Sequence, residues 1–476
     1  MRGSVFMKRM TCMLSGIFIM ILVFAGTVLL IKNTSADEKE TLERTEEVEI
    51  FLTGLRRAEM KAVEVVSHKG SYQIILQGQT AEIAGIEVDC LDTDIIDQVI
   101  FKIETLRGQE IVKVQQNLEQ YGLAQPQASI TVQADDRVWG MEIGCQIPGE
   151  ENSRYVVVDH QDKIYRVNGL NEILIGQLDF VDRSVADIRA IEGCVPASVV
   201  LGGTVRLEDI VLGVSNKEDR NMVPAIQLKV LSKNNYDINY ERTVRGLSDL
   251  LKIEADDVVS YDPSEKEYEE YGLQNPYSTV KYCWEDISGN SGEYRLLASA
   301  PKDGFVYLCR DGYPVIYKVS VALLSWLEWQ YEDVITRYLL LPDIYTLETV
   351  RISCPEWSDA YTLGTTENEV QKVADSKNRA IPVEKFKEFY QCLIGIPAEE
   401  YEEVFVSEEA QSLLEITFVY KDGRDADKIE LLAGPPLQVY LSINGNTDFL
   451  TKSKYVDIIL ENYRNLLTDK DIEPLY

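Results

Sequence analysis

The feature that most constrains this sequence is a hexapeptide that occurs twice, as Tyr-Gly-Leu-Ala-Gln-Pro at 121–126 and as Tyr-Gly-Leu-Gln-Asn-Pro at 271–276. The surrounding residues repeat too: Tyr155, Asp159, Ile164, Tyr165 and Val167 recur 152 residues on as Tyr307, Asp311, Ile316, Tyr317 and Val319. A third, weaker copy follows after another 133 residues, where Val306-Tyr307-Leu308 returns as Val439-Tyr440-Leu441. Self-similarity at a fixed period indicates tandem copies of one module.

Each hexapeptide leads directly into a β-rich segment. The shared positions are Tyr121, Gly122, Leu123 and Pro126 in the first copy, and Tyr271, Gly272, Leu273 and Pro276 in the second. Glycine adopts positive φ without steric cost, leucine can anchor in a core, and proline fixes the backbone at the entry to a strand. We therefore expect both motifs to be structural corners.

Tyr-Gly-Leu-x-x-Pro followed by Ser/Thr-Val, a Val-Tyr strand and an Ile-Tyr-x-Val strand resembles the bacterial domain-of-unknown-function family numbered 4340. The resemblance extends over most of 50–470, although the third copy lacks Tyr-Gly-Leu and matches only in its strands. It implies one amino-terminal membrane segment, an extracytoplasmic body, and genes beside ABC-type exporters of the gliding-motility kind. It carries over no catalytic residue.

The repeat and the hydrophobic periodicity together predict three α+β modules, each an antiparallel sheet covered by helices. A length of 476 residues is in keeping with about three domains of roughly 150 residues. The expected modules are 51–184, 185–338 and 339–476, the last with a degenerate motif. The helices that we expect lie near 95–106, 169–181, 241–253, 320–337, 382–394 and 453–467.

The amino terminus contains an apolar run, Met10–Ile31, without a charged residue. At ~1.5 Å per residue such a helix spans the ~30 Å hydrocarbon layer. Basic residues precede the run and acidic residues follow it, so we expect a cytoplasmic tail at 1–9, a transmembrane helix at 10–31 and a polar stem at 32–50. The alternative is a signal peptide cleaved at Thr34-Ser35-Ala36, although the run exceeds the usual ~7–15 apolar residues.

Charge excludes several kinds of partner. Four of the 47 Lys and Arg residues lie at or before Lys32, whereas all 79 Asp and Glu lie after it, so residues 33–476 carry a formal charge of −36. Such a field repels nucleic acid and anionic lipid headgroups. The acids are scattered, and solubility alone explains them as well as attraction to a basic partner does.

The cysteines predict free thiols. Seven of them, Cys90, Cys145, Cys194, Cys283, Cys309, Cys354 and Cys392, follow the apolar run. An odd number cannot all pair internally, no Cys-x-x-Cys occurs, and a chain of this size needs no disulfides to fold.

Signatures of catalysis and of cofactor binding are absent from the sequence. The two histidines, His68 and His160, form no zinc-binding pair, and the chain lacks a Gly-x-Ser-x-Gly elbow, a phosphate-binding loop and Gly-x-Gly-x-x-Gly. We therefore expect no catalytic residue, metal, cofactor or nucleotide. Two of the many carboxylates could still form a glycosidase pair, because no sequence gives their separation. The acidic turn at 422–427 breaks the calcium-loop pattern and is better explained as a hairpin turn.

Three aromatic residues, Trp326, Trp329 and Tyr331, allow two interpretations. They could form a platform that stacks on sugars or anchors a partner. Their spacing equally suits the core between a sheet and a helix, which is the commoner fate of large aromatic residues.

These observations favour a non-enzymatic, single-pass membrane protein with its amino terminus in the cytoplasm and its three modules outside. The family resemblance suggests an ABC-type permease or another envelope protein as the partner. The alternative functions are binding of cell-wall glycan and carboxylate-dependent hydrolysis.

Overall fold

The computed structural model describes residues 49–113, 118–159, 163–189, 191, 193–214, 228–401, 410–468 and 470–475. These residues form two compact units, one made of residues up to 68 with 99–174, the other of 69–98 with 175–476. The apolar run at 10–31, expected to be a transmembrane helix, lies outside the described residues, as do His160 and the stretch that would carry the third corner. Within the described part, no helix is long and apolar enough to cross a membrane.

The expected α+β class is wrong, because strand outweighs helix by a wide margin. Strands make up 44% of the structure and helices 20%, and the strands form four antiparallel sheets. We call the three large ones sheets 1, 2 and 3, in chain order. The fourth is a pair, β10 (Ser184–Asp187) with β15 (Lys252–Glu254).

Each large sheet contains nine strands. Sheet 1 has the order β1-β5-β9-β8-β7-β6-β2-β3-β4. Its strands are β1 (Glu49–Phe51), β2 (Met60–Ser67), β3 (Gly70–Gln77), β4 (Thr80–Ile83), β5 (Arg107–Lys113), β6 (Ala128–Ala134), β7 (Val138–Gln146), β8 (Ser153–Val158) and β9 (Lys163–Asn168).

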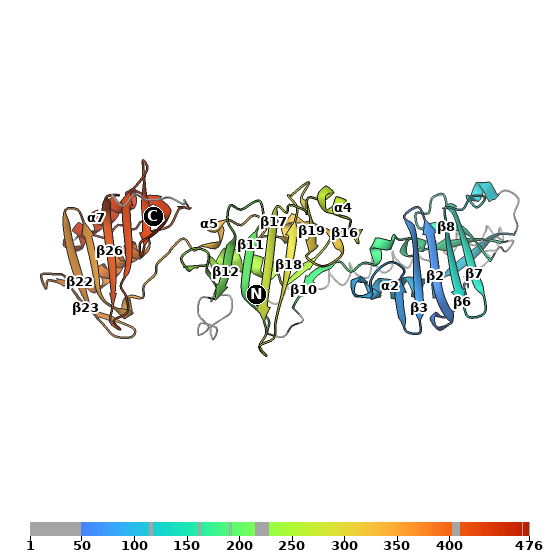
Figure 1. Ribbon diagram of the computed structural model, residues 1–476, viewed down its shortest axis with the longest axis horizontal. Coiled ribbons are helices and arrows are strands. Elements are labelled where there is room, and N and C mark those ends of the chain that lie inside the picture. Colours follow the sequence, from blue (N-terminus) through green and yellow to red (C-terminus); the bar gives the residue numbers. More distant parts are fainter. Residues whose placement is uncertain are drawn as a thin grey trace, which may run out of the picture. The chain divides into compact units, whose positions relative to one another are not determined.

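Sheet 2 has the order β14-β13-β12-β11-β17-β18-β19-β20-β16. Its strands are β11 (Val195–Gly202), β12 (Ile210–Val214), β13 (Leu228–Val230), β14 (Tyr236–Asp237), β16 (Asp257–Tyr261), β17 (Ser278–Glu285), β18 (Ser291–Ala298), β19 (Phe305–Arg310) and β20 (Val315–Ser320). Figure 1 shows β12, β11, β17, β18 and β19 of this sheet side by side.

Sheet 3 has the order β24-β23-β22-β21-β26-β27-β28-β29-β25. Its strands are β21 (Leu347–Cys354), β22 (Trp357–Thr365), β23 (Val370–Ala374), β24 (Ala380–Ile381), β25 (Glu400–Tyr401), β26 (Ser412–Tyr420), β27 (Asp427–Ala433), β28 (Gln438–Ile443) and β29 (Asn446–Lys452).

One strand order recurs in all three sheets, except that the first meander of sheet 1 has three strands instead of four and β1 pairs at the outer edge of β5. Two antiparallel meanders, such as β21 to β24 and β26 to β29, meet at a central pair, which is β2·β6, β11·β17 or β21·β26. Between the meanders a helix takes the chain from one edge of the sheet to the opposite edge. There β5, β16 or β25 pairs with the last strand of the second meander. The sequence repeat therefore corresponds to a repeat of topology.

The connecting helices agree with their apolar periodicity. They are α2 (Thr93–Glu104), α3 (Tyr240–Asp249) and α6 (Val383–Ile394), and α7 (Lys454–Leu466) closes the third copy. A short helix, α4 (Glu265–Glu270), precedes the second corner. At 13 residues α7 is the longest described helix, about 20 Å at 1.5 Å per residue.

Two of the expected helices do not form. Residues 169–181 contain only the 3₁₀ turns η4 (Leu170–Glu172) and η5 (Gln177–Phe180). Residues 320–337 contain the turn η8 (Val321–Leu323) and one helical turn, α5 (Tyr331–Val334). Their apolar residues are buried as the periodicity implied, but in irregular backbone packed against the sheets. This replacement of helix by turns is a main reason why the class prediction failed.

Candidate functional site

The two Tyr-Gly-Leu corners have the backbone that their glycines allow. Gly122 has φ +68° and Gly272 has φ +71°, and each lies just before the strand that opens the second meander, β6 or β17. The leucines after them are buried, with 4% and 2% of their surfaces exposed. Pro126 and Pro276 both stand two residues before these strands.

Each corner leucine lies in a small hydrophobic cluster apart from the main core of its sheet. Leu123 packs with Val157 and Ile164, and Leu273 packs with Cys309 and Ile316 at the equivalent positions. Neighbouring side chains along a strand point to opposite faces, so these clusters lie on the face away from Leu308 and Tyr317 in sheet 2. The motif therefore covers the reverse face of the outer strands of its sheet.

A tyrosine pair borders each corner. Tyr121 meets Tyr155 with ring centroids 5.0 Å apart, and Tyr271 meets Tyr307 at 4.5 Å. The tilted and edge-on arrangements are those that aromatic quadrupoles favour. All eight motif residues thus lie at the turns that lead into the second meanders. Their described contacts are packing and backbone contacts, which indicate a structural role.

The three aromatic residues considered for docking are buried. Trp326 is fully enclosed, Trp329 is 8% exposed and Tyr331 is 7% exposed. Gly246 on α3 leaves the space that the Trp329 ring occupies. They therefore form no exposed platform for sugars or partners, and their role is in the core.

A buried arginine that the sequence analysis missed holds this aromatic segment in place. Arg206 is 7% exposed, and its guanidinium donates hydrogen bonds to the carbonyl oxygens of Gly202, Trp326, Leu327 and Trp329 and to the Ser278 hydroxyl. Burial lowers the pKa of Arg206 to about 10, which leaves it charged at neutral pH. Residues 324–330 are not helical, so the carbonyls of Trp326, Leu327 and Trp329 can accept from the arginine, which ties this irregular segment to sheet 2.

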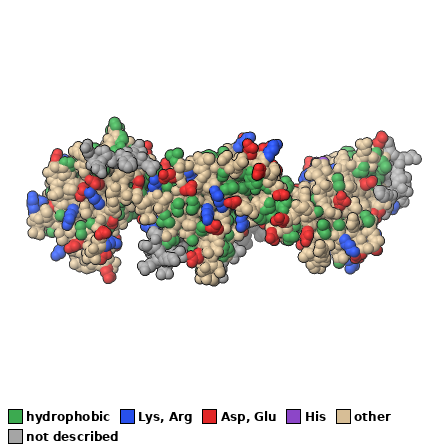
Figure 2. Space-filling model, in the orientation of Figure 1, with side chains coloured by type: hydrophobic (Ala, Val, Ile, Leu, Met, Phe, Trp, Pro, Cys, Tyr) green, Lys and Arg blue, Asp and Glu red, His purple; other side chains and the backbone are tan. Residues whose placement is uncertain are grey.

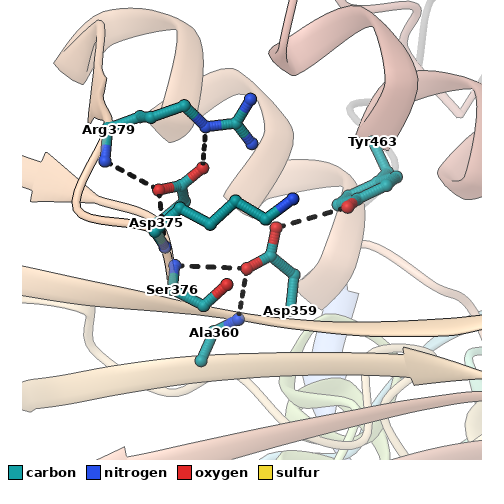
Figure 3. Close-up of polar contacts among 7 residues, drawn as sticks. Asp359, Ala360, Asp375, Ser376, Arg379 and Tyr463 are labelled. Atoms are coloured by element: carbon teal, nitrogen blue, oxygen red, sulfur yellow. Dashed lines mark hydrogen bonds and ion pairs between the residues drawn. The ribbon is translucent and has the colours of Figure 1, made fainter.

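Two buried carboxylates in sheet 3 come closest to the paired acids of a hydrolase (Figure 3). Asp359 on β22 is 8% exposed and Asp375, just after β23, is 3% exposed. Asp359 accepts hydrogen bonds from the backbone of Ala360 at 2.9 Å and Ser376 at 3.2 Å, and from the Tyr463 hydroxyl at 3.2 Å. The Tyr463 ring in turn stacks on Trp357 at 3.6 Å.

Asp375 is held more tightly still. It accepts from the backbone of Lys377 and Arg379 at 3.0 and 2.8 Å, and from Arg379 Nε at 2.6 Å. Burial raises the pKa of Asp375, but the hydrogen bonds and the charge of Arg379 outweigh it, and the net shift is downward. A general acid needs a raised pKa, so the downward shift speaks against that role, and the three hydrogen bonds from Lys377 and Arg379 give Asp375 a structural role in the turn. The Asp-Ser-Lys-Asn-Arg sequence at 375–379 could have revealed that turn.

One polar atom near this pair has no partner. The Tyr361 hydroxyl is fully buried and makes no hydrogen bond within the described residues. Burial and the neighbouring charge of Asp359 both raise its pKa. Tyr361 therefore leaves an unsatisfied polar atom near Asp359 in the core of sheet 3.

In the described part of the chain, no group of three His, Cys, Asp or Glu side chains could hold a metal ion. The acidic turn at 422–427 is a hairpin turn, in which Asp422 accepts from the backbone of Arg424 and Asp427 from Tyr420 and Asn444. All seven described cysteines are free. Figure 2 shows acidic and basic side chains interspersed over the face that it draws.

The comparisons with known proteins give one match. A family model described as "Domain of unknown function (DUF4340)" matches residues 90–192 and 229–413, more than half of the chain. Each matched stretch contains one Tyr-Gly-Leu corner. No curated protein and no solved structure matches the chain.

Proposed function

The chain belongs to the DUF4340 family, and from that premise we propose that it is a non-enzymatic binding or scaffold protein, accessory to an ABC-type export system on the outer side of the cytoplasmic membrane. The observation that carries the proposal is the threefold recurrence of one sheet topology. Tandem arrays of one module typically present extended surfaces to partners.

The side-chain chemistry supports the same proposal. Asp359 and Asp375 are occupied by hydrogen-bond donors, and the conspicuous aromatic residues Trp326 and Trp329 fill the core. What the protein offers to its surroundings is therefore a mixed-charge surface with isolated apolar side chains, such as Leu207, Ile287 and Leu437. Modules with such surfaces suit protein–protein contact.

Crosslinking of the tagged full-length protein in its native membrane tests the partner. A photoreactive residue at the exposed positions Leu207, Ile287 and Leu323, one at a time, samples the surface of the second module, and a buried position such as Leu308 is the matched control. We expect a transporter permease or another envelope protein to be captured from at least one exposed position. Capture of wall glycan alone would replace the proposal by glycan binding.

The location needs a separate measurement. Protease added to intact spheroplasts should degrade the three modules, while a cytoplasmic marker protein survives. Full protection of the modules until the membrane is lysed would contradict the proposed side of the membrane.

A further inference from the structure

A cavity of about 440 Å³ lies within the second compact unit, in the size range of small-molecule sites. Two arginines and two glutamates line it, Arg242, Arg337, Glu332 and Glu399, and Tyr401 and Phe449 add aromatic surface. Its lining is thus charge-balanced and partly apolar, in a chain whose net charge is −32.

Arg337 has hydrogen-bond donors to spare. Its side chain is 62% exposed, and the ion pair that it makes is with Glu399 at the long distance of 3.9 Å. Glu399 is already engaged by Lys452 Nζ at 2.8 Å and by the Tyr455 hydroxyl at 3.0 Å. A guanidinium presents five N–H groups in a fork that matches a carboxylate, so Arg337 can accept an anionic group from outside.

Arg242 stands on the same cavity from α3. One of its terminal nitrogens, Nη1, pairs with Asp333 at 3.0 Å, and the side chain remains 59% exposed. Arg242 therefore adds positive charge to the cavity wall, and its ion pair with Asp333 leaves other N–H groups of the guanidinium able to donate.

Glu332 supplies the opposite charge. It is exposed on α5 and makes no ion pair or hydrogen bond with any described residue. The half-buried ring of Tyr401 meets the buried ring of Phe449, which is 3% exposed, edge-on at 5.6 Å, so Tyr401 presents the aromatic surface beside these charges. The cavity thus combines two exposed, incompletely paired arginines, an exposed carboxylate and aromatic surface.

From this arrangement we propose that the cavity binds a zwitterion with an apolar side chain, an amino acid or a short peptide. Its carboxylate pairs with Arg337 and Arg242, its ammonium group with Glu332, and its side chain packs on Tyr401. A plain anion would be repelled by the acidic protein, and a plain cation would meet two arginines, whereas a zwitterion matches both signs.

Calorimetric titration of the purified full-length protein with the dipeptide Ala-Phe tests the proposal. We expect saturable binding in the millimolar range or tighter. The same dipeptide with an acetylated amino terminus and an amidated carboxyl terminus, which removes both charges, should bind about tenfold more weakly or worse, the loss of at least one charge-assisted pair.

Variants locate the site. Arg337→Gln and Glu332→Gln should each weaken binding of Ala-Phe about tenfold, because each removes one ion pair. Arg351→Gln, at an exposed arginine on β21, is the matched control and should bind as the original protein does. Arg337 and Glu332 are exposed, so all three variants should fold, and their melting temperatures confirm it.

Three results would overturn the proposal. They are no saturable binding of Ala-Phe at millimolar concentrations, equal binding of the doubly capped dipeptide, and equal weakening by Arg351→Gln. Failure to capture an export partner would leave this site unaffected, since the cavity requires no second protein.

Discussion

The corners at Gly122 and Gly272 share a sequence and a backbone conformation but differ in how closely they are packed. A Cβ atom at Gly122 would lie 2.7 Å from the backbone nitrogen of Cys145, whereas at Gly272 the nearest atom is Ser299 Cβ at 3.6 Å. The motif thus specifies the turn, and the neighbouring strand decides how much room the turn has.

The second corner, which is less closely packed, has more hydrogen bonds from side chains in the segment before it. At the second corner α4 begins with a capping box, in which the Ser264 hydroxyl accepts from the backbone of Glu267 and the Glu267 carboxylate accepts from the backbone of Ser264. The Ser260 hydroxyl also donates to Glu267 at 2.7 Å. The first corner follows a single 3₁₀ turn, η3 (Leu118–Tyr121), instead. One corner is stabilised by close backbone packing and the other by a capped helix.

The largest effects should be the same at both corners. Leu123→Ala and Leu273→Ala each empty the centre of a small core and should cost about 2–5 kcal/mol of stability. Hydrogen exchange followed by mass spectrometry should show faster exchange in the corner that carries the substitution. Unchanged exchange at either corner would break the equivalence of the two.

Alanine in place of the glycines should separate the corners. Gly122→Ala combines about 1–2 kcal/mol of left-handed strain with a backbone clash of about 1–3 kcal/mol. Gly272→Ala should show the strain alone, about 1–2 kcal/mol. Exchange rates over 118–146 and 264–299 measure the two costs, and equal losses would show that packing against Cys145 does not matter.

Loss of the cap should affect only the second corner. Ser264→Ala should cost about 1 kcal/mol there. The hydrogen bonds from the Ser264 backbone, then from the Ser260 and Ser264 hydroxyls, hold the pKa of Glu267 below its ordinary 4.5. A lowered folded-state pKa gives stability that is present above pH 4.5 and is lost as pH falls through the folded value. Acid should therefore loosen 264–299 before 118–146, and Glu267→Gln should reduce that difference, the remainder coming from Asp286 and Glu293, whose pKa values hydrogen bonds also lower.

The smallest effect should come from giving the cluster at the second corner one residue of the cluster at the first. Cys309→Val gives the second corner the residue that stands at Val157 in the first, and should change stability by less than about 1.5 kcal/mol. Burial, then the charge of Asp311, raises the pKa of the Cys309 thiol to about 12, so it should resist alkylation in the native protein. Rapid alkylation would show that this core opens.

Short sequence patterns correctly predicted features that depend on neighbouring residues, namely a helix and two turns. The stripe at 95–106 corresponds to α2, and the positive φ of Gly122 and Gly272 agrees with the turn expected from the motif. The face on which Leu123 and Leu273 pack was beyond the pattern, because alternation along a strand shows that faces differ and not which one a distant turn covers.

Long-range contacts account for most of what the sequence analysis missed. Trp326 and Trp329 have helical spacing, yet the Arg206 guanidinium, more than a hundred residues earlier, takes the carbonyls that a helix would use for its own hydrogen bonds. A single arginine in the sequence between β11 and β12 gives no sign of this. The Asp359 contacts likewise join β22, the turn after β23 and α7.

The central strand pairs also bear on the kinetics of folding. Hairpins such as β6·β7 close within a few residues, but Val63 on β2 pairs with Val132 on β6 only after about 70 intervening positions, a costly loop to close. Each meander can therefore form early, while the joining of the two halves is delayed until the helix and the corner between them are in place. Until then β2, β11 and β21 each have one unpaired edge, and a chaperone or rapid corner formation would have to shield those edges from aggregation.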